Sequence, residues 1–237
     1  MGARRQRPTV HQRTLLFVAT SDLLGQKDIK AHVASGMNSS DHLLQCRCGR
    51  LAGVVAKAAR TTRAVCYCRD CQAYAHALGN PKTVLDHVGG TEIVATLQQH
   101  ITLTKGVDSL ACLSLSEGGL LRWYASCCNT PIANTARNAK LSYVGLVHTC
   151  LGRSQRSLDA AFGSASAPVN TKHAKGPVTA SRLGALVSVA RIFASVARAR
   201  LDGTYKRSPF FVAQVGKPVV TPRVLSAAER AKAMNAV

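Results

Sequence analysis

The sequence predicts a mainly β domain followed by a C-terminal extension that is helical and irregular. Three observations lead to this prediction. Short β-forming runs fill the stretch 43–151, this sequence pattern ends near residue 152, and one long helical pattern follows at 181–201. The 237 residues are 46% hydrophobic and 18% charged, which suits a buried core and excludes a disordered chain. We therefore expect one domain at 39–152 and an extension at 153–237.

The β-forming runs are short, and turn residues separate them. Residues 51–56, 92–97, 110–115 and 120–124 are expected to be strands, and Gly-Gly pairs precede two of these runs. The stretch 71–78 is expected to be a short helix that glycine and proline close.

The clearest helix of the extension spans 181–201, after a Gly/Ser/Pro/Lys-rich stretch at 163–177 that is expected to be loop. At about 100° per residue its apolar side chains share one face. The residues of that face are Leu183, Leu186, Val187, Ala190, Phe193, Ala194, Ala197 and Leu201. Arginines flank the face on both sides, so either it packs on the β domain while the arginines reach solvent, or the helix lies on an anionic membrane surface.

The chain is strongly basic, with a formal net charge of +20. Residues 151–237 hold more than half of the excess, with 14 basic and 3 acidic side chains. Such a field attracts phosphates, anionic lipid headgroups or anionic small substrates without selecting among them, and a solvated positive surface also accounts for it. Aromatic residues make up only 5%, which argues against a stacking platform for single-stranded nucleic acid.

Several classes of protein are excluded by what the sequence lacks. No apolar run reaches the roughly 18 to 20 residues of a bilayer span, so no transmembrane segment is expected. A secretory signal and nucleotide-binding glycine motifs are also absent, and we expect a cytoplasmic protein. Residues 1–38 are expected to be a basic, disordered or mis-assigned extension, with the true start at Met1 or Met37.

Five of the nine cysteines lie close together, and three of them form the pattern C-x-C-x-x-C at Cys66, Cys68 and Cys71. In a reducing compartment close-set cysteines indicate metal ligands rather than disulfides. Zinc takes four tetrahedral ligands, and three thiolates at this spacing can bind one ion from a single loop. The fourth position would remain for water, a substrate thiol or a distant residue, which is typical of catalytic zinc.

A second chelating pair, Cys46 and Cys48, needs partners from elsewhere in the chain. The adjacent residues Cys127 and Cys128, in a turn after a predicted strand, are the natural candidates.

Three further residues belong to neither set. Cys112 and Cys150 have no close partner and are expected in the core. His76 is close enough in sequence to Cys71 to be a proton shuttle or a fourth ligand, or it is a plain surface histidine.

The order of the cysteine motifs resembles the glutathione-dependent formaldehyde-activating enzyme and centromere protein V family. The matching segments, within residues 43–150, are Cys46-Arg-Cys48-Gly49, Cys66-Tyr-Cys68-Arg-Asp-Cys71 and Cys128-Asn-Thr-Pro131. The stretch 122–131 and the basic tail look more like a bacterial branch of unassigned function.

The resemblance implies a zinc-containing β-fold called a β-tent, with one or two zinc ions per chain. It places a structural zinc on the first pair and the last pair of cysteines in the motif order. The residues here that match those pairs are Cys46, Cys48 and Cys128. It places a second, more labile zinc, linked to a glutathione adduct, on the central three cysteines.

One position departs from the family pattern. The first cysteine of the family's last C-x-x-C corresponds to Ala125, and Cys127 adjoins Cys128 instead. Either Cys127 supplies the fourth thiolate from a distorted turn, or the structural site is three-coordinate or lost. Asn129 replaces the glycine that follows, and asparagine tolerates a left-handed turn better than most residues.

By this resemblance the protein would be a carbon–sulfur lyase that forms or cleaves adducts between a thiol, such as glutathione, and an aldehyde, such as formaldehyde. Arg63 and Arg69 are candidates for holding substrate carboxylates, and Tyr67, Asp70 and His76 are candidate proton carriers.

Two other functions stay open. The metals could stabilise a non-catalytic module whose basic C-terminal part contacts nucleic acid, a protein partner or an anionic membrane surface. The exposed cysteines could alternatively serve thiol redox chemistry or metal buffering.

Overall fold

The computed structural model describes residues 38, 40–56, 61–152, 157–163, 167–179 and 182–237, with no side chains described for 182–188. The chain divides into two units, Met1–Ser39 and Ser40–Val237, and every element below belongs to the second unit. The extension expected at 1–38 and the start expected at Met37 lie outside the described residues, Asn38 apart. The boundary expected near residue 152 stays a prediction.

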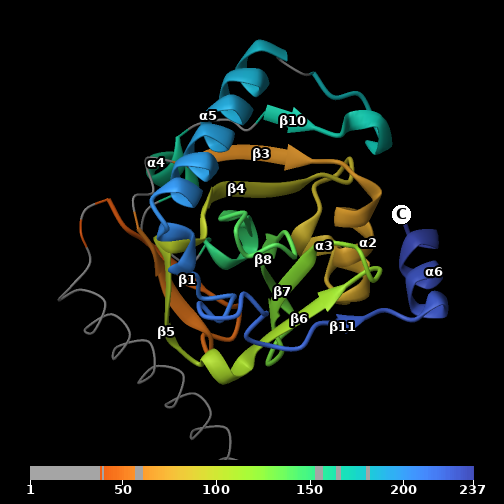
Figure 1. Ribbon diagram of the computed structural model, residues 1–237. Coiled ribbons are helices and arrows are strands. Elements are labelled where there is room, and N and C mark those ends of the chain that lie inside the picture. The colour runs from red at the N-terminus through yellow and green to blue at the C-terminus, as the bar shows by residue number, and fades with distance from the viewer. Residues whose placement is uncertain (1–37, 39, 57–60, 153–156, 164–166, 180–181) are drawn as a thin grey trace, which may run out of the picture. The chain divides into compact units, whose positions relative to one another are not determined.

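Most strands of the described chain come before residue 148, and the longest helix follows in the C-terminal part, as Figure 1 shows. The strands are β1 (His42–Gln45), β2 (Ala52–Val55), β3 (Thr62–Cys66), β4 (Thr91–Leu97), β5 (Ile101–Lys105), β6 (Leu110–Ser114), β7 (Leu121–Ala125), β8 (Thr130–Thr135), β9 (Tyr143–Val147), β10 (Ala167–Val169) and β11 (Arg223–Val224). The α-helices are α2 (Arg69–Ala77), α3 (Pro81–Val84), α4 (Leu158–Phe162), α5 (Arg182–Leu201) and α6 (Ala227–Asn235). Short 3-10 turns are η2 (Gln98–His100), η3 (Val107–Ser109), η4 (His148–Cys150), η5 (Thr171–His173) and η6 (Thr204–Lys206).

The strands form two sheets. Strands β1, β2 and β5 make a three-stranded antiparallel sheet, and the other eight make a sheet in the order β10-β3-β4-β9-β8-β7-β6-β11. Its inner pairs are antiparallel, whereas β10 and β11 pair in parallel at the two edges. The fold is therefore mixed α/β, built on a large mixed sheet, rather than only β. Both edge strands come from beyond residue 152, and they cover edges that would otherwise expose unpaired backbone groups.

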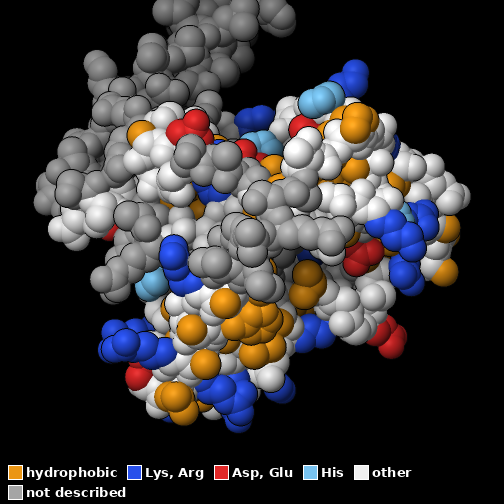
Figure 2. All heavy atoms as spheres, turned by 90° about the horizontal axis from the view of Figure 1, so that it is seen from above, with side chains coloured by type: hydrophobic (Ala, Val, Ile, Leu, Met, Phe, Trp, Pro, Cys, Tyr) orange, Lys and Arg blue, Asp and Glu red, His pale blue; other side chains and the backbone are white. Residues whose placement is uncertain are grey.

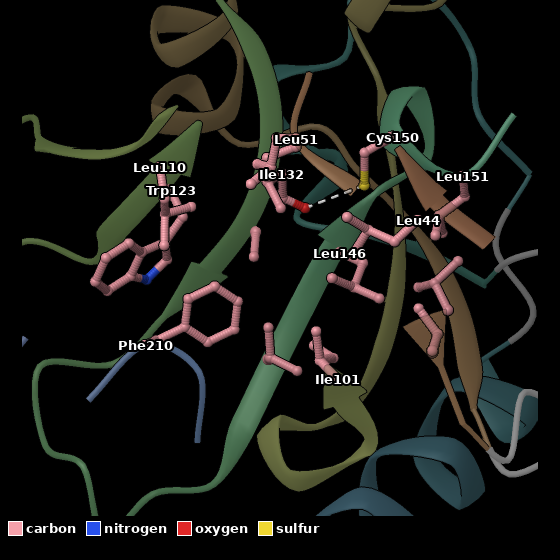
Figure 3. Close-up of a cluster of buried hydrophobic side chains, with 14 of the residues drawn as sticks. Leu44, Leu51, Ile101, Leu110, Trp123, Ile132, Leu146, Cys150, Leu151 and Phe210 are labelled. Atoms are coloured by element: carbon pink, nitrogen blue, oxygen red, sulfur yellow. Dashed lines mark hydrogen bonds between the residues drawn. The ribbon is translucent and has the colours of Figure 1, made fainter. Parts of the chain in front are cut away.

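The main hydrophobic core combines side chains from both sheets (Figure 3). Leu44 and Leu51, from the three-stranded sheet and its turn, pack in the same cluster as Ile132 and Leu146 from the large sheet. Phe210, from the C-terminal part, is fully buried in this cluster. The segment beyond residue 152 is therefore part of the core and not only a covering.

One residue holds a central place in that core. Trp123, the single tryptophan, is fully buried, and the centroid of its ring lies 5.0 Å from that of Phe210. Its indole Nε1 donates a hydrogen bond to Thr135 Oγ1, and its carbonyl accepts one from the Tyr74 hydroxyl. Buried polar atoms of a tryptophan need such partners, so the core at this point is both packed and hydrogen-bonded.

Most expected elements fall close to observed ones. The four expected strands overlap β2, β4, β6 and β7, and the expected helices overlap α2 and α5. The stretch 163–177, expected to be loop, contains β10 and η5, because its backbone pairs with β3. None of the helices in the described part of the chain is long and apolar enough to cross a membrane.

Helix α5 packs by a different face from the one expected. Val196 and Ala199 are buried against Leu97 of β4 and Tyr143 of β9. In contrast, Phe193 is 68% exposed and Leu201 is 89% exposed. Apolar residues lie on more than one side of this helix, and the small side chain of Ala199 lets the backbone come close to the sheet.

Candidate functional site

The first pair of cysteines lies in the tight turn between β1 and β2. Cys46 is buried and Cys48 exposed, and the backbone N–H of Leu51 donates a hydrogen bond to the Cys46 sulfur at 3.3 Å. Gly49 has φ of +78°, a left-handed conformation that lets the turn fold back on itself. The turn therefore presents both sulfurs on one side.

The second pair lies in the turn between β7 and β8. Asn129 adopts φ of +53°, the left-handed geometry that asparagine tolerates. The N–H of Arg47 donates to Thr130 Oγ1 at 2.9 Å, which ties this turn to the first one. The two strand connections therefore bring cysteines 80 residues apart in sequence into one cluster.

Cys46, Cys48, Cys127 and Cys128 form the four-cysteine cluster, in which all four sulfurs lie within 4.8 Å of one another. Sulfur–sulfur distances are 3.6 Å for Cys46–Cys48, 3.8 Å for Cys46–Cys127, 3.3 Å for Cys48–Cys127 and 3.8 Å for Cys127–Cys128. A zinc–sulfur bond of about 2.3 Å sets the edge of a tetrahedron of thiolates at about 3.8 Å. The donor set thus fits a closed tetrahedral zinc site, with Cys127 as the fourth sulfur of the cluster. Ala125, which stands where the resembled motif has a cysteine, is buried in β7.

Cys66, Cys68 and Cys71 form the three-cysteine cluster, whose sulfurs also lie within 4.8 Å of one another. Cys66 ends β3, Cys68 is the N-cap residue of α2, and Cys71 lies in the first turn of that helix. The N–H of Cys71 donates to the Cys68 sulfur at 3.4 Å, and the sulfurs of Cys66 and Cys68 are 3.3 Å apart. Three convergent donors leave one tetrahedral position without a cysteine among the described residues.

The surroundings of the three-cysteine cluster favour negative charge on one of its sulfurs, that of Cys66. Hydrogen bonds from Cys68 and Cys71 lower the pKa of Cys66 to about 2, and the side-chain amide of Asn170 donates to the same sulfur at 3.3 Å. The N-terminus of α2 adds a partial positive charge. Cys71 donates hydrogen bonds to Cys66 and Cys68, which raises its own pKa, so the three thiols share their protons unequally.

A buried arginine lies beside this cluster. Arg122 of β7 is 2% exposed, and its Nη1 lies 3.9 Å from the Cys71 sulfur and donates to Asn134 Oδ1 at 3.2 Å. Its guanidinium lies 5.2 Å from the centroid of the Tyr74 ring, and its Nη2 is 3.8 Å from the half-exposed carboxylate of Asp70. A buried cation is costly unless negative charge compensates it. Asp70 supplies part of that charge, and a thiolate at Cys71 would add to it.

Cys68 is the most exposed residue of the three-cysteine cluster. Cys66 and Cys71 are buried, whereas Cys68 is partly exposed. Strand β10 and the following residue Asn170 cover the Cys66 side, and α2 covers the Cys71 side. A ligand from solution would therefore approach beside Cys68.

The four-cysteine cluster shows a similar division of charge. Burial opposes ionisation of Cys128, but hydrogen bonds from Thr130 and contacts with Cys48 outweigh it and lower the pKa of Cys128 to about 6. Burial raises the pKa of Cys127 and of Cys46.

The structure places the candidate substrate-binding arginines in protein contacts. Arg63 forms ion pairs with Glu92 and Asp159, and Arg69 donates to the carbonyl of Met234 in α6. These contacts, rather than a substrate, account for the position of both side chains. Among the three candidate proton carriers, Asp70 contacts Arg122, the buried arginine beside Cys71.

The other two candidate proton carriers point elsewhere. The Tyr67 hydroxyl donates to Asp86 at 3.2 Å, so it fixes the loop before β4. His76 lines a pocket of about 320 Å³ between α2 and α6, together with Glu229 and Lys232. Burial and the charge of Lys175 lower its pKa. His76 is thus not the fourth ligand of the three-cysteine cluster.

Cys112 and Cys150 stand apart from both clusters, as expected for core residues. The Cys150 sulfur donates to the carbonyl of Val147 at 3.1 Å and lies 3.5 Å from that of Ile132 (Figure 3). Burial raises the pKa of both thiols, that of Cys112 to about 12.

Sequence reasoning missed two neighbours of the three-cysteine cluster. Arg122 interrupts an otherwise apolar strand, and a lone charge in such a run is the signal that could have singled it out. Asn170 is about 100 residues away in sequence from Cys66, and nothing local points to their contact.

These features define a mixed α/β protein with two cysteine clusters that could each hold a metal ion. Residues 39–222 match the model of a family of unknown function (DUF6151), and the chain belongs to that family. A search of curated proteins gave no match. Strand β11 and helix α6 lie outside the matched residues, although α6 packs on α2, the helix that carries Cys71.

Proposed function

We propose that the protein binds two zinc ions with different roles. The four-cysteine cluster would hold a structural zinc, because four sulfurs at tetrahedral spacing complete its coordination. The three-cysteine cluster would hold a second zinc whose fourth position is open to a small thiol. The observation that carries this proposal is the pairing of one closed and one incomplete thiolate set in the same domain.

Arg122 supports an ionised three-cysteine cluster. Three thiolates and one Zn²⁺ carry a net charge of −1, and a guanidinium beside Cys71 would balance it. Without negative charge on these sulfurs, a 2% exposed arginine would depend mainly on a half-exposed carboxylate at 3.8 Å. The buried arginine therefore favours the charged, metal-loaded form of the cluster.

The chemistry we propose is that of carbon–sulfur lyases of the glutathione and formaldehyde type, as the motif order suggests. A zinc ion with an open position, when bound, lowers the pKa of a thiol that reaches it. In the reaction a sulfur–carbon bond forms at the aldehyde carbon, the carbonyl π bond breaks, and the thiol proton passes to the oxygen. The reverse reaction cleaves the adduct. The chain contributes the anchoring thiolates, the compensating charge of Arg122 and the approach beside Cys68.

A second candidate function is a non-catalytic module in which both clusters only stabilise the fold. The nearly complete burial of Cys66 and Cys71 favours it, since structural thiolate sites are commonly shielded. The first proposal, of a carbon–sulfur lyase, also includes a β-tent architecture and membership of the glutathione-dependent enzyme family.

Cobalt substitution separates the two functions. Zinc would be replaced by Co²⁺, whose visible spectrum reports ligand identity, and glutathione would then be titrated in. Catalytic use of the three-cysteine cluster predicts a spectral change in the wild type and in Cys112→Ser, but none in Cys71→Ser. An unchanged wild-type spectrum would support the module with two structural metals.

A direct test of turnover follows. Exchange between free formaldehyde, glutathione and their adduct can be measured by NMR, and the wild type should accelerate it relative to Cys71→Ser. Equal exchange rates in the two proteins would exclude carbon–sulfur chemistry of this type.

A further inference from the structure

The outward face of α5 is apolar, although it faces solvent in the described chain. Side chains of α5 are described from residue 189 onward. Among them, Val196 and Ala199 pack inward, and Ile192, Ser195 and Arg198 line a pocket beside β4. The large apolar residues that are exposed in this described part of α5 are Val189 at 45%, Phe193 at 68% and Leu201 at 89%.

In a helical projection, exposed apolar residues of α5 gather on one side of the helix. At about 100° per residue, five exposed apolar residues fall within an arc of about 100° on the side away from the sheet. These residues, which we call the outward stripe, are Ala190, Phe193, Ala194, Ala197 and Leu201. No charged side chain falls inside the arc. A surface helix ordinarily places such a stripe against the core and its charges in solvent.

Basic residues border the outward stripe. Arg191 and Arg198 lie on one side of it in projection and Arg200 on the other, and all three are exposed. Between residues 189 and 207 there are five basic side chains and one acidic one, Asp202. Figure 2 views the molecule from above Figure 1, where α5 lies near the top, and hydrophobic side chains gather there in one area with Lys and Arg side chains around it.

We propose that the outward stripe of α5 is a docking surface for an anionic lipid bilayer. An apolar stripe flanked by arginines matches an interface whose outer layer is negatively charged and whose inner layer is hydrocarbon. Phe193 and Leu201 would enter the acyl boundary, and the three arginines would contact headgroup phosphates. Helix α5 would lie in the plane of the membrane surface and would not cross it.

Other occupants fit the stripe less well. In a second copy of the chain, flanking arginines would face arginines, and like charges oppose such pairing. A nucleic acid binds chiefly through its phosphates and would leave the apolar stripe in water. A protein groove usually takes several large anchors at helical spacing, whereas here three of the five residues are alanines. A deformable lipid surface has no such requirement.

The test measures binding of the full-length protein to vesicles by co-sedimentation. Vesicles of phosphatidylcholine alone would be compared with vesicles that also contain phosphatidylserine. The proposal predicts binding to the second kind only. Phe193→Ser combined with Leu201→Ser keeps every charge and should weaken this binding by on the order of tenfold or more, because two apolar side chains no longer leave water.

A charge variant and matched controls complete the design. Replacing Arg191, Arg198 and Arg200 by glutamine should weaken binding on the order of 100-fold, since each basic residue near an anionic surface contributes about 1 kcal/mol. The control replaces three exposed lysines elsewhere, Lys82, Lys105 and Lys140, by glutamine, and the control for the apolar pair is Val215→Ser at 64% exposure. Both controls should bind within a few-fold of the wild type. Fluorescence of Trp123 confirms that each variant is folded.

Three results would overturn the proposal. The first is a wild-type protein that does not bind anionic vesicles. Binding that the charge control weakens as much as the arginine variant, with no effect of Phe193→Ser and Leu201→Ser, would indicate attraction by net charge alone. A wild-type dimer that the apolar variant converts to a monomer would assign the stripe to a second copy.

Discussion

The C-terminal segment completes the hydrophobic core, and Phe210→Ala tests this most sharply. Phe210 is fully buried, and its ring stacks at a tilt against Trp123 with a centroid distance of 5.0 Å. Truncating a buried phenylalanine to alanine costs about 3 to 5 kcal/mol, since transfer free energy is lost and a cavity remains. An aromatic pair contributes about 0.5 to 1.5 kcal/mol within such a figure.

The backbone around Phe210 will not relax easily to fill that cavity. The N–H of Val219 donates to the carbonyl of Phe210 at 3.0 Å, and Phe211 pairs with Pro218 in an isolated bridge. Ser208 Oγ donates to Gln98 Oε1 at 2.6 Å, which fixes the start of the segment on the domain. We therefore expect a cost of about 4 kcal/mol, near the middle of the range.

The assay is urea unfolding followed by the fluorescence of Trp123, the single tryptophan of the chain. The matched control is Phe193→Ala, the same substitution at a side chain that is 68% exposed, for which we expect a change within about 0.5 kcal/mol. In thermal unfolding, Phe210→Ala should lower Tm by roughly 8 to 16 °C for a chain of this size. A loss below about 1 kcal/mol for Phe210→Ala, or an equal loss for both variants, would refute the reasoning.

Three further predictions concern the clusters and the core. Arg122→Met should weaken metal retention by the three-cysteine cluster. Arg122→Lys, which keeps the charge, should partly restore it. Competition with a chromophoric chelator measures metal retention in both variants. Burial raises the pKa of Cys112 to about 12 from an ordinary value of 9, so stability should fall as the pH rises from 9 towards 12. Urea unfolding of Cys112→Ala should show a shallower fall over that window. Asn129→Gly should be tolerated at φ of +53°, whereas Asn129→Val should release metal from the four-cysteine cluster and lower Tm, because a β-branched residue is strained there.

The sequence was most informative where chemistry is local. The spacing of Cys66, Cys68 and Cys71 predicts a cluster because all three lie within one strand end and one helical turn. The fourth member of the other cluster could not be assigned from spacing alone. Whether both Cys127 and Cys128 turn toward Cys46 depends on the left-handed residue Asn129 and on the contact between two distant turns.

Long-range pairing was the part that the sequence could not supply. The strands β10 and β11 are three and two residues long, and they exist because an edge of the sheet is available to them. Arg122 was missed for the same reason, since its partner Cys71 is 51 residues away. Packing of the expected apolar face of α5 on the domain, one of two alternatives, was wrong, because periodicity identifies an apolar stripe without stating whether protein or solvent meets it.

The most direct test of the two-zinc proposal is the number of tightly bound zinc ions per chain, measured on protein purified under reducing conditions without chelator. The proposal predicts about two per chain for the wild type and for Cys112→Ser, and about one for Cys71→Ser, because each thiolate cluster holds one ion. Wild-type protein without zinc, or a Cys71→Ser variant that keeps both ions, would contradict it.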